Sequence, residues 1–395
     1  MENNGKYIAM LNVAILFVAS VCSVFYFESP LYFAISERGG NNISITALIY
    51  LFIGFVIYLY PISKLNFSGK IIYPYWGGKD AISIVIIVVG LLSVIPFIEN
   101  LSVVLKMSAI DMAETYDLKQ HEEIDTRGHL STIGHFCNGI VMWLRYIAPI
   151  LFFYAIATRR KWYVIMLSFL SLLSPVLIGM MSGGRGPLYG LLTILMLNFI
   201  LFRTYFDDDI TKKVLKIGVI LGVLMVIILT LMTFARDEGE TYMAINQITR
   251  YIGEGWVNFA ETGWYTDVHT GGHSIFNGTG HTFMKSISDF FESRHWEQLS
   301  VFTHMRMYVY YTIIGDYYID FGLIGGLLFP SLLALVFYKT VYQRPNHFSS
   351  IIIINLYAKL GLTGYGCFCY MNYAEFVLFT LFVYAICRLF EPDYK

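Results

Sequence analysis

The sequence contains few charged residues. Asp, Glu, Lys and Arg make up 14% of its 395 residues, whereas about 25% is usual for a soluble domain. So few charges cannot cover a water-facing surface, which excludes an ordinary soluble protein. The formal net charge of −1 offers no general attraction for nucleic acid, so we expect no nucleic-acid partner.

Cysteine is also scarce, and the five cysteines are scattered, most of them in or beside apolar runs. Cys367 and Cys369 are too close for an easy disulfide, and no second pair completes a zinc site. His269 and His273 have the spacing of a zinc helix, but Thr-Gly-Gly separates them and disfavours a helix. We therefore predict no metal and no cofactor. Internal repeats and low-complexity tracts are absent as well.

Long apolar runs dominate the chain, which is 56% hydrophobic and has a mean hydropathy of +0.60. A hydrocarbon core of about 30 Å needs roughly 20 apolar helical residues. Runs of this kind occur at about 7–27, 45–62, 81–98, 139–157, 162–181, 187–202, 217–234, 321–338, 350–367 and 374–388. We predict an all-α, polytopic integral membrane helix bundle with about ten transmembrane helices, forming a single transmembrane domain over residues 1–395.

The distribution of lysine and arginine predicts the orientation. With the N-terminus in the cytoplasm, the inner segments hold 15 of the 27 cations in about 60 residues, and the outer segments hold 10 in about 155. Arg145 and Lys359 are the two that lie inside spans. Both termini are therefore predicted to be cytoplasmic. The first run has a single lysine before it and no clear cleavage site, so we do not expect a removable signal peptide.

Two of the predicted external segments are long, at about 99–138 and 235–320. Loops of this length are usually functional or disordered, and the tryptophans of the second argue against disorder. Within 235–320, apolar residues recur at helical spacing (Ile245, Ile248, Ile252 and Trp256). This spacing predicts an interfacial helix on the membrane surface, so 235–320 is expected to be a large external loop with interfacial helices.

An aromatic-rich segment, Val309–Gly322, places Asp316 and Asp320 at the outer end of a predicted span. Acids at this position cost free energy unless they face protein or water. Both are therefore candidates for function. Asp237 and His304, elsewhere in the large loop, are further candidates for acid–base chemistry.

Arginines on the predicted external side of the membrane could bind phosphate. Arg185 lies in the turn 182–187, whose glycines let backbone amides approach a ligand just before a helix that begins at Pro187. The alternative is a glycine turn whose arginine binds a lipid headgroup. Arg236, Arg250 and Arg306 carry the planar fork that suits phosphate oxygens, and the alternative for each is a solvated mixed-charge loop.

Lys359 is the deepest charge in the predicted spans. A lysine near the bilayer centre costs on the order of 3 kcal/mol, so it should face the bundle interior and find a partner, for which Glu375 is a candidate. Arg145 lies nearer the outer end of its span and could extend toward the interface.

The stretch from Tyr311 to Gly325 resembles the signature of bacterial oligosaccharide repeat-unit polymerases, the Wzy-type O-antigen and capsule polymerases. In that family a tyrosine–threonine pair, two aromatics and Asp-Phe-Gly lead into a glycine-rich group of spans. Ser182-Gly-Gly-Arg-Gly186 is similar to the family's small-residue-plus-arginine motif. Where many relatives have arginine–proline before the paired aromatics, this chain has Gly315-Asp316, so Arg306 would have to supply any phosphate contact there.

The resemblance implies a GT-C-like architecture and a metal-independent glycosyltransferase in the bacterial inner membrane. Such an enzyme transfers a glycan from undecaprenyl pyrophosphate to the sugar of another lipid-linked repeat unit, during synthesis of lipopolysaccharide O-antigen, capsule or exopolysaccharide. A chain-length regulator and a flippase are the implied protein partners.

The side-chain chemistry agrees with this reaction. Arg185, Arg236, Arg250 and Arg306 could stabilise the departing pyrophosphate. Asp320, Asp316, His304 and Asp237 are the candidate bases. A weaker set could contact sugar or lipid: Tyr311, Tyr317, Tyr318, Trp264 and Lys359.

Other functions remain open at this point. A related glycan ligase would use the same groups to transfer a finished polymer to a different acceptor. A transporter or flippase predicts internal pseudo-symmetry, broken helices and several charges near the midplane, whereas only Lys359 is deep here. A membrane acyltransferase would normally place a histidine at a span, and no predicted span contains one.

Overall fold

The computed structural model describes most of the chain. The described residues are 4–29, 32, 43–66, 70–76, 79–108, 111, 115, 128–181, 186–236, 241–272, 300, 301, 303, 305, 311–365 and 373–392. Nearly all regular structure in these ranges is α-helix. One small antiparallel hairpin pairs β1 (Tyr75–Trp76) with β2 (Lys79–Asp80).

Seven of the described helices are long and apolar enough to cross a membrane. They are α1 (Asn4–Phe27), α3 (Ile45–Ser63), α4 (Ala81–Val104), α8 (Trp162–Met181), α9 (Gly186–Phe202), α10 (Asp208–Arg236) and α14 (Ile313–Val341). Two shorter apolar helices follow, α15 (Phe348–Gly364) and α16 (Tyr373–Phe390). The predicted α-helical membrane protein is confirmed. Each of the ten predicted runs overlaps a helix, but the number of complete crossings stays a prediction.

The predicted span at 139–157 is not one straight helix. It consists of α6 (Thr132–Leu144) and α7 (Ala148–Ala157), which are bent by 75° relative to each other. The bend has a local cause, because Pro149 lies in the first turn of α7 and cannot donate a backbone hydrogen bond to the preceding turn. If the bent pair counts as one crossing, the described part of the chain has up to eight.

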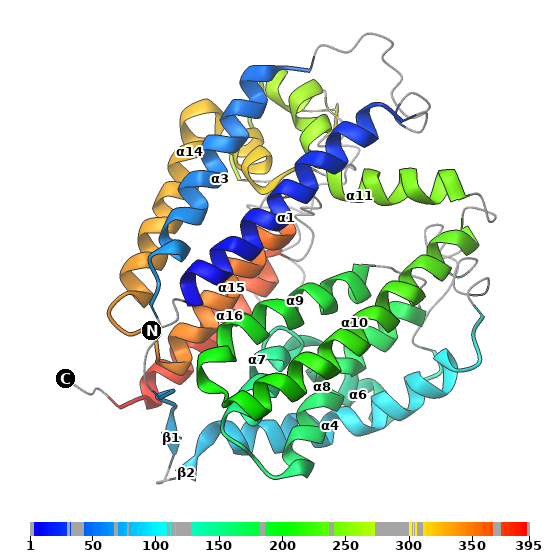
Figure 1. Cartoon of the computed structure of the whole chain (residues 1–395), viewed down its shortest axis with the longest axis vertical. Helices are drawn as coiled ribbons and strands as arrows, with labels where there is room; N and C mark the ends of the chain where they lie inside the picture. The colour runs from blue at the N-terminus through cyan, green and yellow to red at the C-terminus, as the bar shows by residue number, and fades with distance from the viewer. Residues whose placement is uncertain are drawn as a thin grey trace.

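The helices form two groups that share one central helix (Figure 1). In one group α4 packs against α6 and α8, and α7, α8 and α9 contact one another. In the other, α3 packs against α1 and α14, while α11 (Thr241–Glu261) lies along α1. Helix α15 contacts members of both groups and is buried on almost every side.

Several connections that are rich in lysine and arginine lie together at one end of the bundle, the cation-rich end. Backbone hydrogen bonds join Ile72 to Asn346 at 3.0 Å and Phe348 to Ile72 at 2.8 Å. At the same end the Tyr205 hydroxyl donates to Asn346 at 3.0 Å. These segments are all predicted to be cytoplasmic, so the structure gathers them on one side as alternating spans require.

Helix α11 is the helix predicted from apolar spacing inside the large loop. Ile245 and Ile248 are exposed, while Trp256 is buried and its Nε1 donates to the backbone carbonyl of Tyr365 at 2.6 Å. The second half of α11 is therefore part of the core. The backbone amide of Ser44, just before α3, donates to Ala260 at 3.1 Å, which fixes the end of α11 beside the start of α3.

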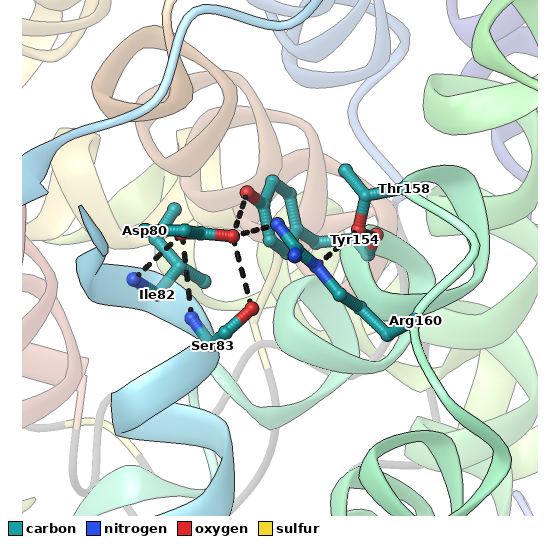
Figure 2. A network of polar contacts seen from close by, with 6 residues as sticks. All are labelled: Asp80, Ile82, Ser83, Tyr154, Thr158 and Arg160. Carbon is teal, nitrogen blue, oxygen red and sulfur yellow. Dashed lines mark hydrogen bonds and ion pairs between the residues drawn. The ribbon is translucent and has the colours of Figure 1, made fainter. Parts of the chain in front are cut away.

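A polar network at the cation-rich end ties α4 to the turn between α7 and α8 (Figure 2). Asp80 caps α4 by accepting from the backbone amides of Ile82 at 3.0 Å and Ser83 at 3.4 Å. The Tyr154 hydroxyl also donates to Asp80, at 2.9 Å, and the guanidinium of Arg160 forms an ion pair with it. The Asp80 carboxylate thus accepts hydrogen bonds from the first backbone amides of α4 and from a buried tyrosine, and it forms an ion pair with an arginine.

We expect Arg160→Met to lower the free energy of unfolding by about 2–3 kcal/mol, because it leaves a largely buried carboxylate without its cation. Arg159→Met is the matched control. The Arg159 side chain is 67% exposed in its pair with Asp207, against 29% for Arg160, and exposed pairs contribute less than about 1 kcal/mol. Thermal unfolding in detergent measures both. Equal effects of the two substitutions would contradict a structural role for this network.

Candidate functional site

Helix α14 is broken at Gly322. This residue has φ 72° and ψ −169°, a conformation that is essentially restricted to glycine. A Cβ placed on Gly322 would lie 2.7 Å from Nε2 of His269. Both the backbone conformation and the neighbouring imidazole therefore require glycine at this position.

The break turns the chain back on itself. The rings of Tyr317 and Phe329 are 4.8 Å apart between centroids, and those of Phe321 and Phe329 are 5.2 Å apart. Twelve residues of continuous helix would separate Tyr317 from Phe329 by about 18 Å. The segment 313–321 is thus a short helix that lies back against the start of the longer part, which contains nearly all of the predicted span 321–338.

The short helix is enclosed by neighbouring helices. A Cβ on Gly54 of α3 would lie 2.5 Å from Ile314, and one on Gly364 of α15 would lie 2.7 Å from Ile313. These two glycines allow both helices to approach the segment closely. Every residue from Ile313 to Asp320 is consequently buried, although the sequence predicted that this stretch lies at the outer end of a span.

Asp316 and Asp320 lie one turn apart on this short helix, with exposures of 0% and 1%. Residues at this spacing are neighbours on one helix face. Within the part of the chain that the structure describes, neither carboxylate oxygen of Asp316 has a hydrogen-bond partner. An isolated polar group of this kind costs several kcal/mol to bury. The two acids are therefore the least expected feature of the core, and functional sites are where such arrangements occur.

The loop after η2 (Gly263–Tyr265) docks on the end of the short helix. The Thr270 hydroxyl donates to Oδ1 of Asp320. The backbone amides of Thr270 and Gly271 donate to the carbonyls of Ile319 at 3.2 Å and Asp320 at 2.9 Å. The loop thereby satisfies carbonyls that the helix break leaves open and fixes the Asp320 side chain.

Aromatic rings surround Tyr318 beside the two acids. Trp264 stacks on Tyr318 with centroids 5.0 Å apart, and Tyr50 and Phe259 meet the same ring edge-on at 5.4 and 5.3 Å. The exposed His269 contacts it at 5.7 Å. The Tyr318 hydroxyl donates to the carbonyl of Trp264 at 2.9 Å. A rigid aromatic cluster, in which Tyr318, Tyr50 and Phe259 are buried, thus adjoins the acids. The exposed imidazole of His269 lies at its edge.

The structure brings together four residues of the predicted set: Asp316, Asp320, Tyr318 and Trp264. Tyr311 is buried nearby, its hydroxyl 3.4 Å from that of Thr262. Tyr317 instead packs on Phe329, within α14. Contact of Tyr311 and Tyr317 with a substrate stays a prediction.

Arg250 has an internal partner. Its Nε lies 3.0 Å from a carboxylate oxygen of Glu254, one turn along α11. Burial raises the pKa of Glu254 above its usual range, and the charge of Arg250 only partly offsets this. The guanidinium is therefore committed to compensating a buried acid, and its predicted contact with pyrophosphate would compete with that pair.

Several predicted residues lie outside the described residues. These are Arg185, Asp237, His304 and Arg306, together with the side chains of Arg236 and Glu375. Lys359 is described, and its ammonium lies over the ring of Tyr146 rather than in the acid site. Among the described residues, no group of three or more His, Cys, Asp or Glu could hold a metal ion.

Sequence reasoning missed Tyr50 and Thr270, and considered His269 only as a metal ligand. Thr270 precedes Gly271 and Gly272, which both have positive φ, 64° and 98°, and form the turn that delivers the threonine to Asp320. The Gly-Gly pair was a readable signal of a tight turn. Nothing in the sequence around Tyr50 points to a partner more than 200 residues away.

No family model, no curated protein and no solved structure matches this chain. The arrangement of its own residues is therefore what supports a functional proposal.

We expect Gly322→Ala to destabilise the protein by about 1–3 kcal/mol, because alanine is strained at this backbone conformation and its Cβ meets His269. Gly218→Ala is the matched control, since a Cβ there, inside α10, meets nothing within 4 Å. It should stabilise the protein by up to about 1 kcal/mol. Thermal unfolding of both variants in the same detergent provides the comparison. A Gly322→Ala protein as stable as the Gly218→Ala protein would contradict the break.

Proposed function

We propose that the protein is a metal-independent membrane glycosyltransferase that polymerises lipid-linked oligosaccharide repeat units. The donor would be a glycan on undecaprenyl pyrophosphate, and the acceptor the sugar of another lipid-linked unit. The observation that carries the proposal is the buried pair Asp316 and Asp320 beside the stacked rings of Tyr318 and Trp264. The motif resemblance falls on the same short helix.

In this reaction Asp320 is the base. Its carboxylate takes the proton of the acceptor hydroxyl as that oxygen attacks the anomeric carbon of the donor sugar. The bond between that carbon and the pyrophosphate oxygen breaks, and the electron pair leaves with the pyrophosphate. The hydrogen bond from Thr270 orients Asp320, and Asp316, one turn away, offers a second position for the proton.

The aromatic cluster supports the choice of a sugar substrate. Trp264 is half-buried and is held by its stacking on the buried Tyr318, and its indole can contact the apolar face of a sugar while hydroxyl groups bind polar neighbours. His269, which is exposed at the edge of this cluster, is available to contact a substrate that enters from outside the bundle.

The proposal includes the cellular setting. The protein would lie in the bacterial inner membrane with both termini in the cytoplasm and the acid site toward the periplasm, in a GT-C-like architecture. It would act after a flippase and alongside a chain-length regulator, in synthesis of O-antigen, capsule or exopolysaccharide. A glycan ligase is the nearest alternative, and polymerised but unattached glycan in a deletion strain would favour it.

One observation favours a different class of membrane protein, an ion-coupled transporter. A broken helix that carries two buried acids is typical of ion-coupled transporters, and the break at Gly322 was not expected from the sequence. A transporter would lose substrate flux on neutralisation of Asp316 or Asp320 while the glycan chain length stayed normal. The same substitutions therefore separate the two functions.

We expect Asp320→Asn to reduce glycan polymerisation about 10²- to 10⁴-fold, the usual contribution of a general base. In a deletion strain complemented with the variant, surface glycan on a gel should collapse from a ladder to single repeat units. The amide keeps the shape of the side chain and can still accept from Thr270, so the fold should persist.

Asp208→Asn is the control, because Asp208 is an exposed acid at the start of α10 and should leave the ladder unchanged. A full-length ladder from a normally expressed Asp320→Asn protein would rule out Asp320 as the base.

A further inference from the structure

The side chain of Asp316 is closed off from water on the short helix. Its exposure is 0%, and among the described residues neither carboxylate oxygen accepts a hydrogen bond. Apolar groups cover the helix around it, because a Cβ on Gly315 would lie 3.0 Å from the Phe259 ring, and Ile319 is fully buried. In the described part of the chain, Asp316 therefore has neither water nor a protein donor to stabilise a negative charge.

Asp320, one turn farther along the short helix, has a different environment. The Thr270 hydroxyl donates to its Oδ1, and a hydrogen bond to a carboxylate favours its charged form. A charge on Asp320 in turn disfavours a second charge on Asp316, since like charges at this spacing repel each other. The surroundings of the two acids thus favour different charge states, and such a difference assigns the proton within a pair of acids.

No cation of the described residues compensates Asp316. Asp320 is the one titratable group in the described ranges whose charge acts on it. Arg250 of α11 forms its ion pair with Glu254 at 3.0 Å, and Nζ of Lys359 on α15 lies over an aromatic ring, 5.5 Å from its centroid. The charged groups of the two helices that pack around the short helix are therefore directed at other partners.

The titratable groups of α3 and of the docking loop also contact other groups. The Tyr50 hydroxyl of α3 donates to the carbonyl of Leu323 at 3.0 Å. On the short helix itself, the Tyr318 hydroxyl donates to the carbonyl of Trp264 at 2.9 Å. The His269 imidazole of the loop meets the Tyr318 ring edge-on. Each of these groups thus has its own contact away from the Asp316 carboxyl.

A proton is the ligand that this position can take. An isolated ionised carboxylate in an apolar interior costs far more free energy than a neutral carboxyl, and such a group takes up a proton instead. Asp316 lies in the first turn of α14, but the positive potential of a helix start is weak beside that cost. A proton needs no cavity, whereas a metal cation or a sugar hydroxyl would need space beside a side chain that is fully enclosed.

We propose that the acid pair binds one proton at neutral pH, and that Asp316 carries this proton while Asp320 is ionised. The proton site follows from burial and contacts; its role in the reaction rests on the proposed glycosyltransferase function. The two proton positions of the site are not equivalent, because only Asp320 is empty and can take the proton of an acceptor hydroxyl. The site then carries one negative charge rather than two, which lowers its repulsion of an anionic pyrophosphate substrate.

Infrared difference spectroscopy of the purified full-length protein in detergent tests the proton directly. At neutral pH, the spectrum of the wild type minus that of Asp316→Asn should contain the carbonyl band of a protonated carboxylic acid, which moves to lower frequency in heavy water. The spectrum of the wild type minus that of Asp320→Asn should instead contain carboxylate bands. Asp208→Asn is the control, because Asp208 is an exposed acid and should also give carboxylate bands alone.

Carboxylate bands without an acid band, in the difference spectrum of a folded Asp316→Asn protein, would overturn the proposal. Asp316→Glu keeps the acid group on a side chain that is one methylene longer, and it decides the question if the asparagine variant does not fold. A shift in the frequency of the acid band in Asp316→Glu identifies residue 316 as the carrier of the proton. An acid band that is absent or unshifted contradicts it.

Salt dependence distinguishes a proton from a metal cation on the same oxygens. The melting temperature of the wild type should be equal in sodium, potassium and choline chloride at one ionic strength. A higher melting temperature in sodium or potassium chloride than in choline chloride, abolished by Asp316→Asn, would assign the oxygens to a metal cation and overturn the proton.

The glycan ladder of the strain that carries Asp320→Asn separates this result from a failure of the proposed function. If the ladder stays normal while the acid band is assigned to Asp316, the proton site stands without the polymerase. If the ladder is lost while Asp316 gives carboxylate bands, the polymerase stands and the proton site falls.

Discussion

The backbone conformation of Gly322 is the constraint on which the candidate site depends. With a helical residue at this position, α14 would continue as one straight helix and Asp316 and Asp320 would extend away from the core. Because Gly322 has a positive φ, the short helix instead lies between α3 and α15. Its acids are buried, and His269 occupies the space that a side chain at Gly322 would need. The docking of Thr270 on Asp320 follows from the same turn.

Helix α15 connects the polar features of the protein. Its first residues lie at the cation-rich end, where the backbone amide of Ser349 donates to buried Glu391 at 2.7 Å. Lys359 and Tyr146 meet farther along it, and Gly364 reaches the short helix of α14. At the cation-rich end, Asp80 secures the start of α4 and the turn around Arg160. Each of these polar contacts joins segments that are distant in the sequence.

The sequence predicted the helices well because hydropathy and length suffice to identify apolar helical runs. It did not predict the two bends. Pro149 and Gly322 can both be read from the sequence. However, proline also occurs in the first turn of straight helices, and both residues also occur inside membrane spans. Asp316 and Asp320 were recognised as candidates, whereas Tyr50 and Thr270 were not, since contacts across 268 and 50 residues leave no local pattern. The pairing of Arg250 with Glu254 was readable from i, i+4 spacing.

The reversal of α14 at Gly322 is tested most directly by thiol crosslinking in a cysteine-free background. Tyr317→Cys with Phe329→Cys should be joined by a short bifunctional thiol reagent, because these side chains are in contact. Leu323→Cys with Leu335→Cys has the same sequence separation on the straight part of α14, where about 18 Å would separate the pair, and should remain unlinked. Mass spectrometry of the linked peptides gives the answer. A Tyr317–Phe329 pair that crosslinks no better than this control would show a continuous helix and contradict the site.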